Sequence, residues 1–211
     1  MDWWPDEVRR LLDEVLDAGT RSIALCWDDI RTTNPEVLAG QHASVFLDLY
    51  AYLRGRDPGV RVSAVLPPYG GIPGRNLVFS KPGGGERYLA VMRDALPADV
   101  RVFWTGDGGV FSTTVTTVGA RAYADAVGLE LGLWDNDATR FSTGRQPCSG
   151  RAPDLSSVVH TCMGNLVGDG LWDGSNGEFA LLTSLFYTWN PSTYDPAAAA
   201  TAAERILATG P

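Results

Sequence analysis

The chain has 211 residues, of which 45% are hydrophobic and 20% charged, a composition typical of a soluble globular protein with one domain. It carries 17 Lys and Arg against 25 Asp and Glu, for a formal net charge of -8. Nucleic acids and anionic membranes are bound by basic patches, so this charge argues against both as partners. The longest apolar runs have the length of strands and fall well short of the roughly 20 residues that cross a bilayer.

The N-terminus, the cysteines and the histidines indicate which kinds of targeting segment and metal site the chain lacks. The opening stretch MDWWPDEVRRLLDEVLDAG begins with acids and lacks the basic and apolar regions of a secretory signal, and the sequence leaves the compartment open. Cys26 lies in an apolar run, which favours a buried inert thiol, whereas Cys148 and Cys162 could pair in an oxidising compartment. With only two histidines and no CxxC motif, we expect no metal site and no cofactor.

The predicted elements begin with a helix over residues 6–18, where apolar residues recur at helical spacing between Pro5 and Gly19. A strand-length apolar run at 22–27 follows, and then a long helix at 34–54 with Pro35 in its first turn. The rest of the chain, in order, is predicted as a strand at 60–66, a Gly- and Pro-rich loop at 67–85, a helix at 86–96, a strand at 100–104, a helix at 118–127, a strand at 129–134, a polar stretch to 154, a strand at 157–163, and helices at 178–189 and 197–207.

Strands and helices alternate along most of this order, which is typical of a parallel sheet in an α/β protein. The strands are apolar throughout instead of alternating, as expected where both faces of a sheet are covered. We therefore predict an α/β fold whose functional face lies at the C-terminal ends of the strands.

Distinctive polar residues follow four successive strands. Polar residues also mark where strands stop, so each position alone means little. Together with three tryptophans they favour a site for a sugar, because aromatic rings pack on the C–H faces of a pyranose while carboxylates and amides bond its hydroxyl groups. The positions are Asp28 and Asp29, residues 67–69, Thr105 and Gly106, and Asp135 and Asn136, with Trp27, Trp104 and Trp134 beside them.

Two glycine-rich stretches resemble ligand-binding loops without matching them. The sequence GDGGV at 106–110 contains an acid and no following lysine, which disfavours a phosphate-binding loop of the Walker type. The sequence DGLWDGSNGE at 169–178 lacks the acid spacing of an EF-hand calcium loop. We therefore predict the stretch at 169–178 as a loop without a calcium site.

Five motifs carry a resemblance to a known family: RSIALCWDDI, GQHASVF, VFWTGDGGV, LWDND and LTSLFYTWNP. Their order and spacing are similar to those in the catalytic barrel of glycoside hydrolase family 84, the β-N-acetylglucosaminidases that include the O-GlcNAcases and bacterial enzymes called hyaluronidases. The resemblance covers residues 6–207, approximately the whole chain. It implies a partial (β/α)8 TIM barrel of about five β/α units, corresponding to strands four to eight, in one N-terminally incomplete catalytic domain over 1–211.

The resemblance also implies a mechanism for the two adjacent aspartates. In this family the 2-acetamido oxygen of the substrate is the nucleophile, and an oxazoline forms without attack by an enzyme carboxylate. By the family pattern, Asp28 is the anion that orients the acetamido N–H, and Asp29 is the general acid and base. Because adjacent residues of a regular strand point to opposite faces, the backbone is expected to turn at this pair. The implied substrate is a glycan or glycoprotein with terminal β-linked N-acetylglucosamine.

Other family positions carry over one by one to the ends of the following strands. Tyr69 matches a tyrosine that helps close the acetamido pocket, and Thr105 and Val110 fall in the segment that lines this pocket. Trp134 is expected to pack on the N-acetyl methyl group. Asn136 is expected to bond the sugar or the acetamide.

The remaining motif residues divide into structural positions and one further candidate. Trp27 and Trp104 are predicted to pack in the core. His42 is predicted to be a packed histidine on a helix, far from the strand ends. The family has an Asn-Pro pair before its last helices, and Asp169 and Gly170 stand there in this chain, so Asp169 is a candidate substrate-binding residue.

Departures from the family leave the function open between classes. Segments for the first three barrel strands are absent, and Arg140 and Phe141 stand where the family has an Asn-Asp pair. Five strands cannot close an eight-stranded barrel, so two edges are expected to stay open, where copies of the chain or a complementing chain could associate. The chain is either a glycosidase or a non-catalytic remnant that binds a sugar or a protein. An unrelated α/β hydrolase is disfavoured because no G-x-S-x-G motif occurs.

Overall fold

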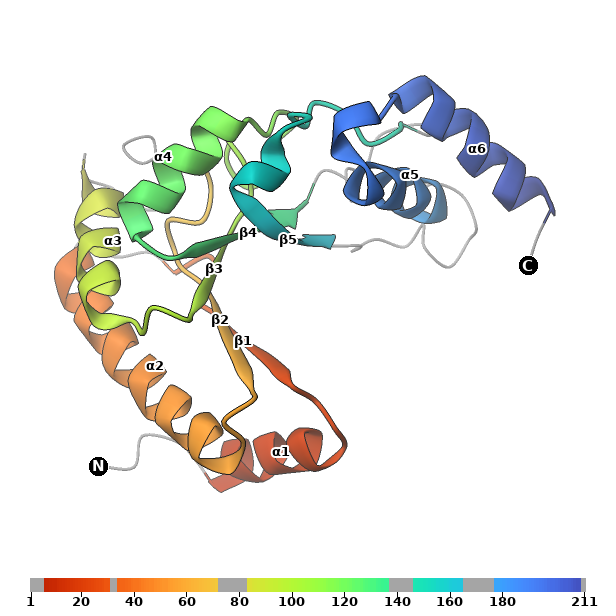
Figure 1. Cartoon of the computed structure of the whole chain (residues 1–211). Helices are drawn as coiled ribbons and strands as arrows, with labels where there is room; N and C mark the ends of the chain where they lie inside the picture. Colours follow the sequence, from red (N-terminus) through yellow and green to blue (C-terminus); the bar gives the residue numbers. More distant parts are fainter. Residues whose placement is uncertain (1–5, 31–33, 72–82, 137–145, 165–176, 210–211) are drawn as a thin grey trace.

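The computed structural model describes residues 6–30, 34–71, 83–136, 146–164 and 177–209. Its strands form one sheet in which the spatial order follows the sequence and every neighbouring pair is parallel (Figure 1). The α/β fold with a parallel sheet is therefore confirmed. The strands are β1 (Ser22–Cys26), β2 (Arg61–Val65), β3 (Arg101–Trp104), β4 (Glu130–Asp135) and β5 (Val159–Gly164).

The helices lie mainly along the outer side of the curved sheet, with α5 and α6 beyond β5 (Figure 1). Their bounds agree with the predicted ones to within two residues. Among the described residues, no helix is both long and apolar enough to span a bilayer. The helices are α1 (Asp6–Asp17), α2 (Pro35–Arg56), α3 (Gly84–Ala95), α4 (Thr117–Val127), α5 (Gly177–Trp189) and α6 (Pro196–Thr209), with single 3-10 turns η2 (Leu155–Ser157) and η4 (Pro191–Thr193).

Helix α4 shows how local sequence sets the ends of an element. The hydroxyl oxygen of Thr116 accepts a hydrogen bond from the backbone N–H of Gly119 at 2.9 Å, which satisfies one of the free donors of the first turn. The helix ends at Gly128, whose φ of 65° is a left-handed conformation that glycine adopts without steric cost. These two residues fix where the segment between β3 and β4 begins and ends its helix.

The main core lies between the outer face of the sheet and helices α2, α3 and α4. Alternate residues of the central strands point toward these helices, as the pleat requires. Their side chains and the facing helix residues are almost completely buried. This layer includes Val62, Ala64, Val102, Leu131 and Leu133 from the strands and Phe46, Leu53, Leu89 and Met92 from the helices.

The inner face of the sheet carries a second, smaller apolar cluster near the ends of the strands. Gly132 lies beside Phe103 across the β3–β4 pair, and a Cβ on Gly132 would lie 2.6 Å from the Phe103 ring. Only glycine therefore leaves room for this ring. The cluster comprises Val65, Tyr69 and Phe103, with Trp134 and Met163 packed against them.

Strand β1 lies at one edge of the sheet and is covered on one side. Ile23 and Leu25 pack against the main core, whereas Ser22, Ala24 and Cys26 alternate with them and are exposed on the inner face. The prediction that Cys26 is buried is therefore wrong. An apolar run indicates two covered faces only where tertiary structure supplies both, and no described segment covers the inner face of β1.

Candidate active site

The two adjacent aspartates lie in a turn directly after β1. Asp29 has a φ of 59°, and no other non-glycine residue in the described part of the chain has a positive φ. Aspartate tolerates this left-handed conformation better than most residues. The turn places Asp28 half-buried and Asp29 exposed. The backbone therefore turns at this pair, as the sequence predicted.

Tyr69, which follows β2, makes a direct contact with this turn. Its hydroxyl donates a hydrogen bond to Oδ1 of Asp29 at 2.8 Å, while its side chain is only 2% exposed. Burial raises the pKa of Tyr69 well above its usual range, and the hydrogen bond to Asp29 and the charges of Asp29 and Asp28 add to this. The phenol therefore stays protonated and remains a donor throughout the neutral range.

An apolar floor lies beside the Tyr69–Asp29 pair. The rings of Tyr69 and Trp134 are tilted by 35° with centroids 5.9 Å apart. Val65 and Phe103 lie under them on the inner face, and both are buried. A carboxyl pair next to an aromatic and aliphatic floor can receive a ligand that has both polar and apolar parts, such as an amidosugar.

The loop after β3 forms the neighbouring wall and is held by internal hydrogen bonds. The Thr105 hydroxyl donates to the Gly109 carbonyl at 2.7 Å, and the Asn136 side-chain amide donates to the Val110 carbonyl at 2.9 Å. Thr105 and Asn136 are both buried, whereas Val110 is 36% exposed. Thr105 and Asn136 therefore shape the loop that presents the Val110 side chain.

This loop also packs closely against the segment after β2. The backbone N–H of Thr105 donates to the Tyr69 carbonyl at 2.9 Å, and that of Gly71 donates to the Gly106 carbonyl at 2.9 Å. A Cβ on Gly70 would lie 2.9 Å from the backbone of Gly109. The glycines of these two strand ends therefore allow their backbones to touch, which brings Tyr69 and the loop into one wall.

Comparison with known proteins identifies the family of this chain. The sequence profile of the family described as NAGidase, β-N-acetylglucosaminidase, matches residues 5–210. The chain belongs to the β-N-acetylglucosaminidases of glycoside hydrolase family 84. This family consists of glycoside hydrolases, so the predicted enzyme class is confirmed. A search of curated protein sequences gave no match.

Solved structures show the same fold over most of the chain. A mutant of the O-GlcNAc hydrolase of Thermobaculum terrenum superposes with a TM-score of 0.78 and 21% identity, covering 96% of this chain and 43% of that one. The protein CpGH84B superposes with a TM-score of 0.73 and 22% identity, covering 92% of this chain and 33% of that one. The chain thus spans less than half the length of either glycosidase-family relative.

The structure gathers most of the predicted family positions at the C-terminal ends of the strands. Asp28, Asp29, Tyr69 and Trp134 converge there from β1, β2 and β4, and the β3 loop adds its wall. Asp169, together with Arg140 and Phe141, lies outside the described residues. Thr105, Val110 and Asn136 belong to the wall beside these four residues.

The predicted core role of the tryptophans is confirmed, and one prediction about a histidine needs correction. Trp27 and Trp104 are 9% and 0% exposed. His42 is packed, as predicted, but it does not lie far from the strand ends. Its ring stacks on Trp27, directly before Asp28, with centroids 4.4 Å apart. The long helix α2 crosses the sheet, and this brings its first half to the end of β1.

The supporting contacts of two carboxylates, Asp107 and Asp135, were not predicted from the sequence. Asp107 accepts hydrogen bonds from the Thr116 backbone N–H at 2.6 Å and the Thr116 hydroxyl at 2.9 Å, which ties the β3 loop to the start of α4. Asp135 forms a buried ion pair with Arg151, whose Nε lies 3.0 Å from Oδ2. Asp107 and Thr116 are nine residues apart in the sequence, and Asp135 and Arg151 are sixteen apart, so no local pattern signals either contact.

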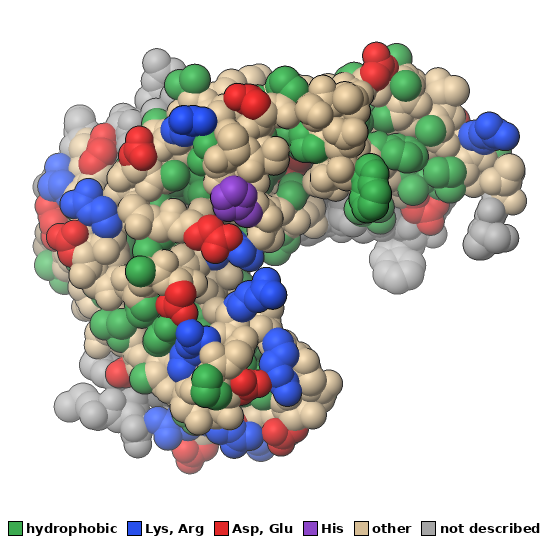
Figure 2. All heavy atoms as spheres, viewed as in Figure 1, with side chains coloured by type: hydrophobic (Ala, Val, Ile, Leu, Met, Phe, Trp, Pro, Cys, Tyr) green, Lys and Arg blue, Asp and Glu red, His purple; other side chains and the backbone are tan. Residues whose placement is uncertain are grey.

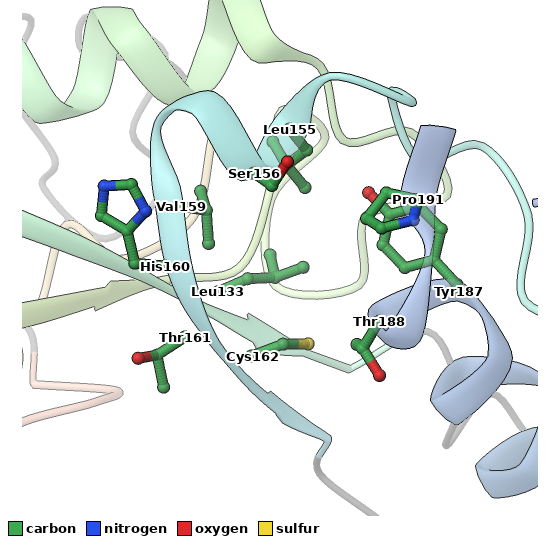
Figure 3. Close-up of a pocket in the computed structure, with 10 residues that line it drawn as sticks. All are labelled: Leu133, Leu155, Ser156, Val159, His160, Thr161, Cys162, Tyr187, Thr188 and Pro191. Carbon is green, nitrogen blue, oxygen red and sulfur yellow. The ribbon is translucent and has the colours of Figure 1, made fainter. Parts of the chain in front are cut away.

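A separate cavity of about 400 Å³ lies on the outer side of β5, toward α5 (Figure 3). His160 and Cys162 from β5 and Tyr187 and Thr188 from α5 are among its lining residues. None of the candidate site residues lines it. Cys162 and Cys148 are both free thiols, as is Cys26.

Proposed function

We propose that the protein is a retaining β-N-acetylglucosaminidase that cleaves terminal β-linked N-acetylglucosamine from a glycan or glycoprotein by substrate-assisted catalysis. One observation carries the proposal: Asp28 and Asp29 share a turn at the end of β1, and Tyr69 donates a hydrogen bond to Asp29. The family assignment supports the same chemistry.

The hydrogen bond from Tyr69 gives the two oxygens of Asp29 different tasks. Oδ1 accepts a hydrogen bond from the phenol, so Oδ2 is left to carry the acidic proton or to accept one from water. Asp28 is half-buried beside it and supplies the anion that orients the acetamido N–H. The floor of Trp134, Val65 and Phe103 receives the methyl group of the acetamide.

The reaction then proceeds in two steps, formation of the cyclic intermediate and its hydrolysis. Asp29 gives its proton to the glycosidic oxygen while the acetamido oxygen attacks the anomeric carbon, which releases the alcohol and forms an oxazolinium ion that keeps the N–H proton of the acetamide. Asp28 stabilises the positive charge that develops on the acetamido nitrogen. Asp29, now a carboxylate, takes a proton from water as the water attacks the anomeric carbon and opens the oxazolinium ion, which restores the neutral acetamide. Two inversions at the anomeric carbon give net retention.

The proton-transfer role of Asp29 is tested with leaving groups of different acidity. In Asp29→Asn, we expect hydrolysis of an alkyl N-acetyl-β-glucosaminide to fall about 100-fold or more, and that of a nitrophenyl glycoside by less than about ten-fold, because a nitrophenolate leaves without a proton. Asp48→Asn on the exposed side of α2 is the matched control and should retain activity on both. Equal losses on both substrates would refute the acid role.

Substrate assistance is tested by binding. A thio-oxazoline analogue of N-acetylglucosamine should bind the protein in calorimetry, and Asp28→Asn should weaken this binding by about ten-fold or more, since a charge-assisted hydrogen bond is lost. Product analysis by NMR should show the β-anomer first. If the α-anomer appears first, the enzyme is inverting and the proposal fails.

A non-catalytic sugar-binding role is the second candidate. The chain spans 43% and 33% of the two solved relatives, and Ser22, Ala24 and Cys26 leave the inner face of β1 exposed. A protein of this kind would bind the thio-oxazoline or N-acetylglucosamine and release no product from the nitrophenyl glycoside. The same pair of measurements therefore separates the two roles.

A further inference from the structure

The residue directly before the aspartate pair is held by an unusual aromatic contact. The imidazole of His42 on α2 lies parallel to the Trp27 ring, with an interplanar angle of 4° and centroids 4.4 Å apart. Phe46, one turn further along α2, packs on the same tryptophan at 6.2 Å. The backbone N–H of Trp27 donates to the Val65 carbonyl at 2.9 Å. Trp27 is therefore fixed both through its backbone and through its ring.

A buried hydrogen bond fixes the imidazole in turn. His42 Nδ1 lies 2.6 Å from the hydroxyl oxygen of Tyr88 on α3, and their rings meet edge to face at 5.8 Å. His42 is 7% exposed and Tyr88 is fully buried. Burial lowers the pKa of His42 to about 4, so the ring is neutral at physiological pH. This hydrogen bond between His42 Nδ1 and the Tyr88 hydroxyl fixes the plane of the imidazole ring.

We propose that His42 is a positioning residue for the Asp28–Asp29 turn, acting through Trp27 and oriented by Tyr88. The inference deepens the proposed function and rests on it for its kinetic consequence. Packing alone would need only an apolar side chain of similar volume at position 42. The parallel stack and the buried hydrogen bond instead define one orientation of the Trp27 ring.

The turn needs such support because of its backbone conformation. Asp29 has a φ of 59°, a left-handed conformation that costs some free energy even for aspartate, so contacts from its surroundings stabilise it. From the sheet side, Tyr69 holds the Asp29 carboxyl, and from the helix side His42 holds Trp27. The helix-side contact thus prevents the turn from relaxing into other conformations.

The test uses two substitutions that preserve volume. His42→Phe keeps a ring against Trp27 and removes the hydrogen bond, and Tyr88→Phe removes the same bond from the other side. Leu53→Val is the control, because Leu53 is a fully buried core residue of the same helix, three turns from His42. Backbone ¹⁵N relaxation dispersion reports motion of Asp28 and Asp29 on the microsecond-to-millisecond timescale.

We expect both test variants to show dispersion at Asp28 and Asp29 that the parent and Leu53→Val lack. On a nitrophenyl N-acetyl-β-glucosaminide, kcat should fall about ten-fold while KM changes less than about two-fold, the rate effect of one lost hydrogen bond. The double variant should be no worse than either single one, because both remove the same contact.

The measurements distinguish a failure of the proposed glycosidase activity from a failure of the positioning role of His42. If the parent hydrolyses no glycoside, the proposed function fails, and the dispersion data still decide whether His42 orders the turn. If the parent is active and both variants keep its kcat, the positioning role is refuted, whatever the dispersion shows. If His42→Phe fails to fold, Tyr88→Phe, which loses a single hydroxyl, gives the decisive result.

Discussion

At the scale of single residues, the hydrogen bond between the side chains of Tyr69 and Asp29 joins the ends of β2 and β1. We predict that Tyr69→Phe lowers kcat on aryl glycosides by about ten-fold, because Asp29 then loses the donor that holds Oδ1. Steady-state kinetics measures this. Tyr50→Phe is a matched control, since Tyr50 donates to the carboxylate of Asp99 at 2.8 Å on the surface. A similar loss in both variants would contradict the prediction.

His42 supplies a second prediction at this scale, on acid stability. Its pKa is about 4 in the folded protein against an ordinary value of 6.5, because burial disfavours the charged ring. The unfolded chain therefore takes up a proton as the pH falls below 6.5, while the folded protein takes it up only near pH 4. Stability from this group is fully present above pH 6.5 and is lost as the pH falls from 6.5 to 4.

Urea unfolding at pH 7 and pH 5 tests this linkage. The free energy of unfolding of the parent should fall by about 1 to 2 kcal/mol more than that of His42→Phe, which has no group to protonate at this position. The comparison of the two proteins cancels the carboxylates that also titrate in this range. Identical pH dependence of the two proteins would show that His42 is not the group responsible.

Sequence patterns located the candidate site residues whose position follows from local structure. Asp28, Asp29 and Tyr69 each follow a predicted strand, and parallel strands bring such positions to one edge. The contacts that support them could not be predicted from sequence. His42 meets Tyr88 across 46 positions and Asp135 meets Arg151 across 16, and their pairing depends on how helices and loops pack.

At the scale of elements, the loop between β3 and α4 depends on a close approach that only glycine permits. A Cβ on Gly119 would lie 1.7 Å from Oδ1 of Asp107, so any side chain must displace this carboxylate from Thr116. We predict that Gly119→Ala lowers the free energy of unfolding by about 2 to 4 kcal/mol, since two hydrogen bonds to a charged group are lost.

The control for this prediction is a glycine in a helix without a close neighbour. A Cβ on Gly40 in α2 meets nothing within 4 Å, so Gly40→Ala should raise the free energy of unfolding by about 0.5 to 1 kcal/mol. Urea unfolding of both variants gives the comparison. If Gly119→Ala were as stable as the parent, the Asp107 contact would not hold the loop.

At the scale of the whole molecule, the sheet ends in two strands that each have a neighbour on one side. Trp27 N–H donates to Val65 and Arg61 N–H to Arg21, so the intervening N–H groups of Ala24 and Cys26 point to the open edge of β1. Within the described residues no strand pairs with this edge or with the free edge of β5. Such edges favour association.

Exposed apolar side chains beside the β5 edge add to this tendency. Trp189 is 90% exposed and Leu185 is 53% exposed, both on α5, and Ile206 on α6 is 45% exposed. Figure 2 shows hydrophobic side chains gathered over the α5 and α6 end of the molecule. Large apolar side chains that gather on an exposed surface favour an interaction site there.

We predict that the protein self-associates in solution through its open edges. Light scattering after size-exclusion chromatography should show a mass that rises with concentration. Ala24→Lys, which places an inward-pointing charge on β1, should reduce this association, because natural edge strands use the same device. Arg205→Lys on α6 keeps the surface charge and serves as the control. A monomer at all concentrations would contradict the prediction.

The sequence by itself determined the order and type of the elements, the parallel sheet and the positions where polar residues meet at its edge. These follow from short-range periodicity, from glycine and proline positions and from the direction of parallel strands. Tertiary structure alone decided which faces are covered and what holds the site. Cys26 is exposed because its strand lies at an edge, and His42 reaches Trp27 because α2 crosses the sheet. Burial and side-chain pairing depend on contacts between segments that are distant in the sequence, so no local pattern predicts them.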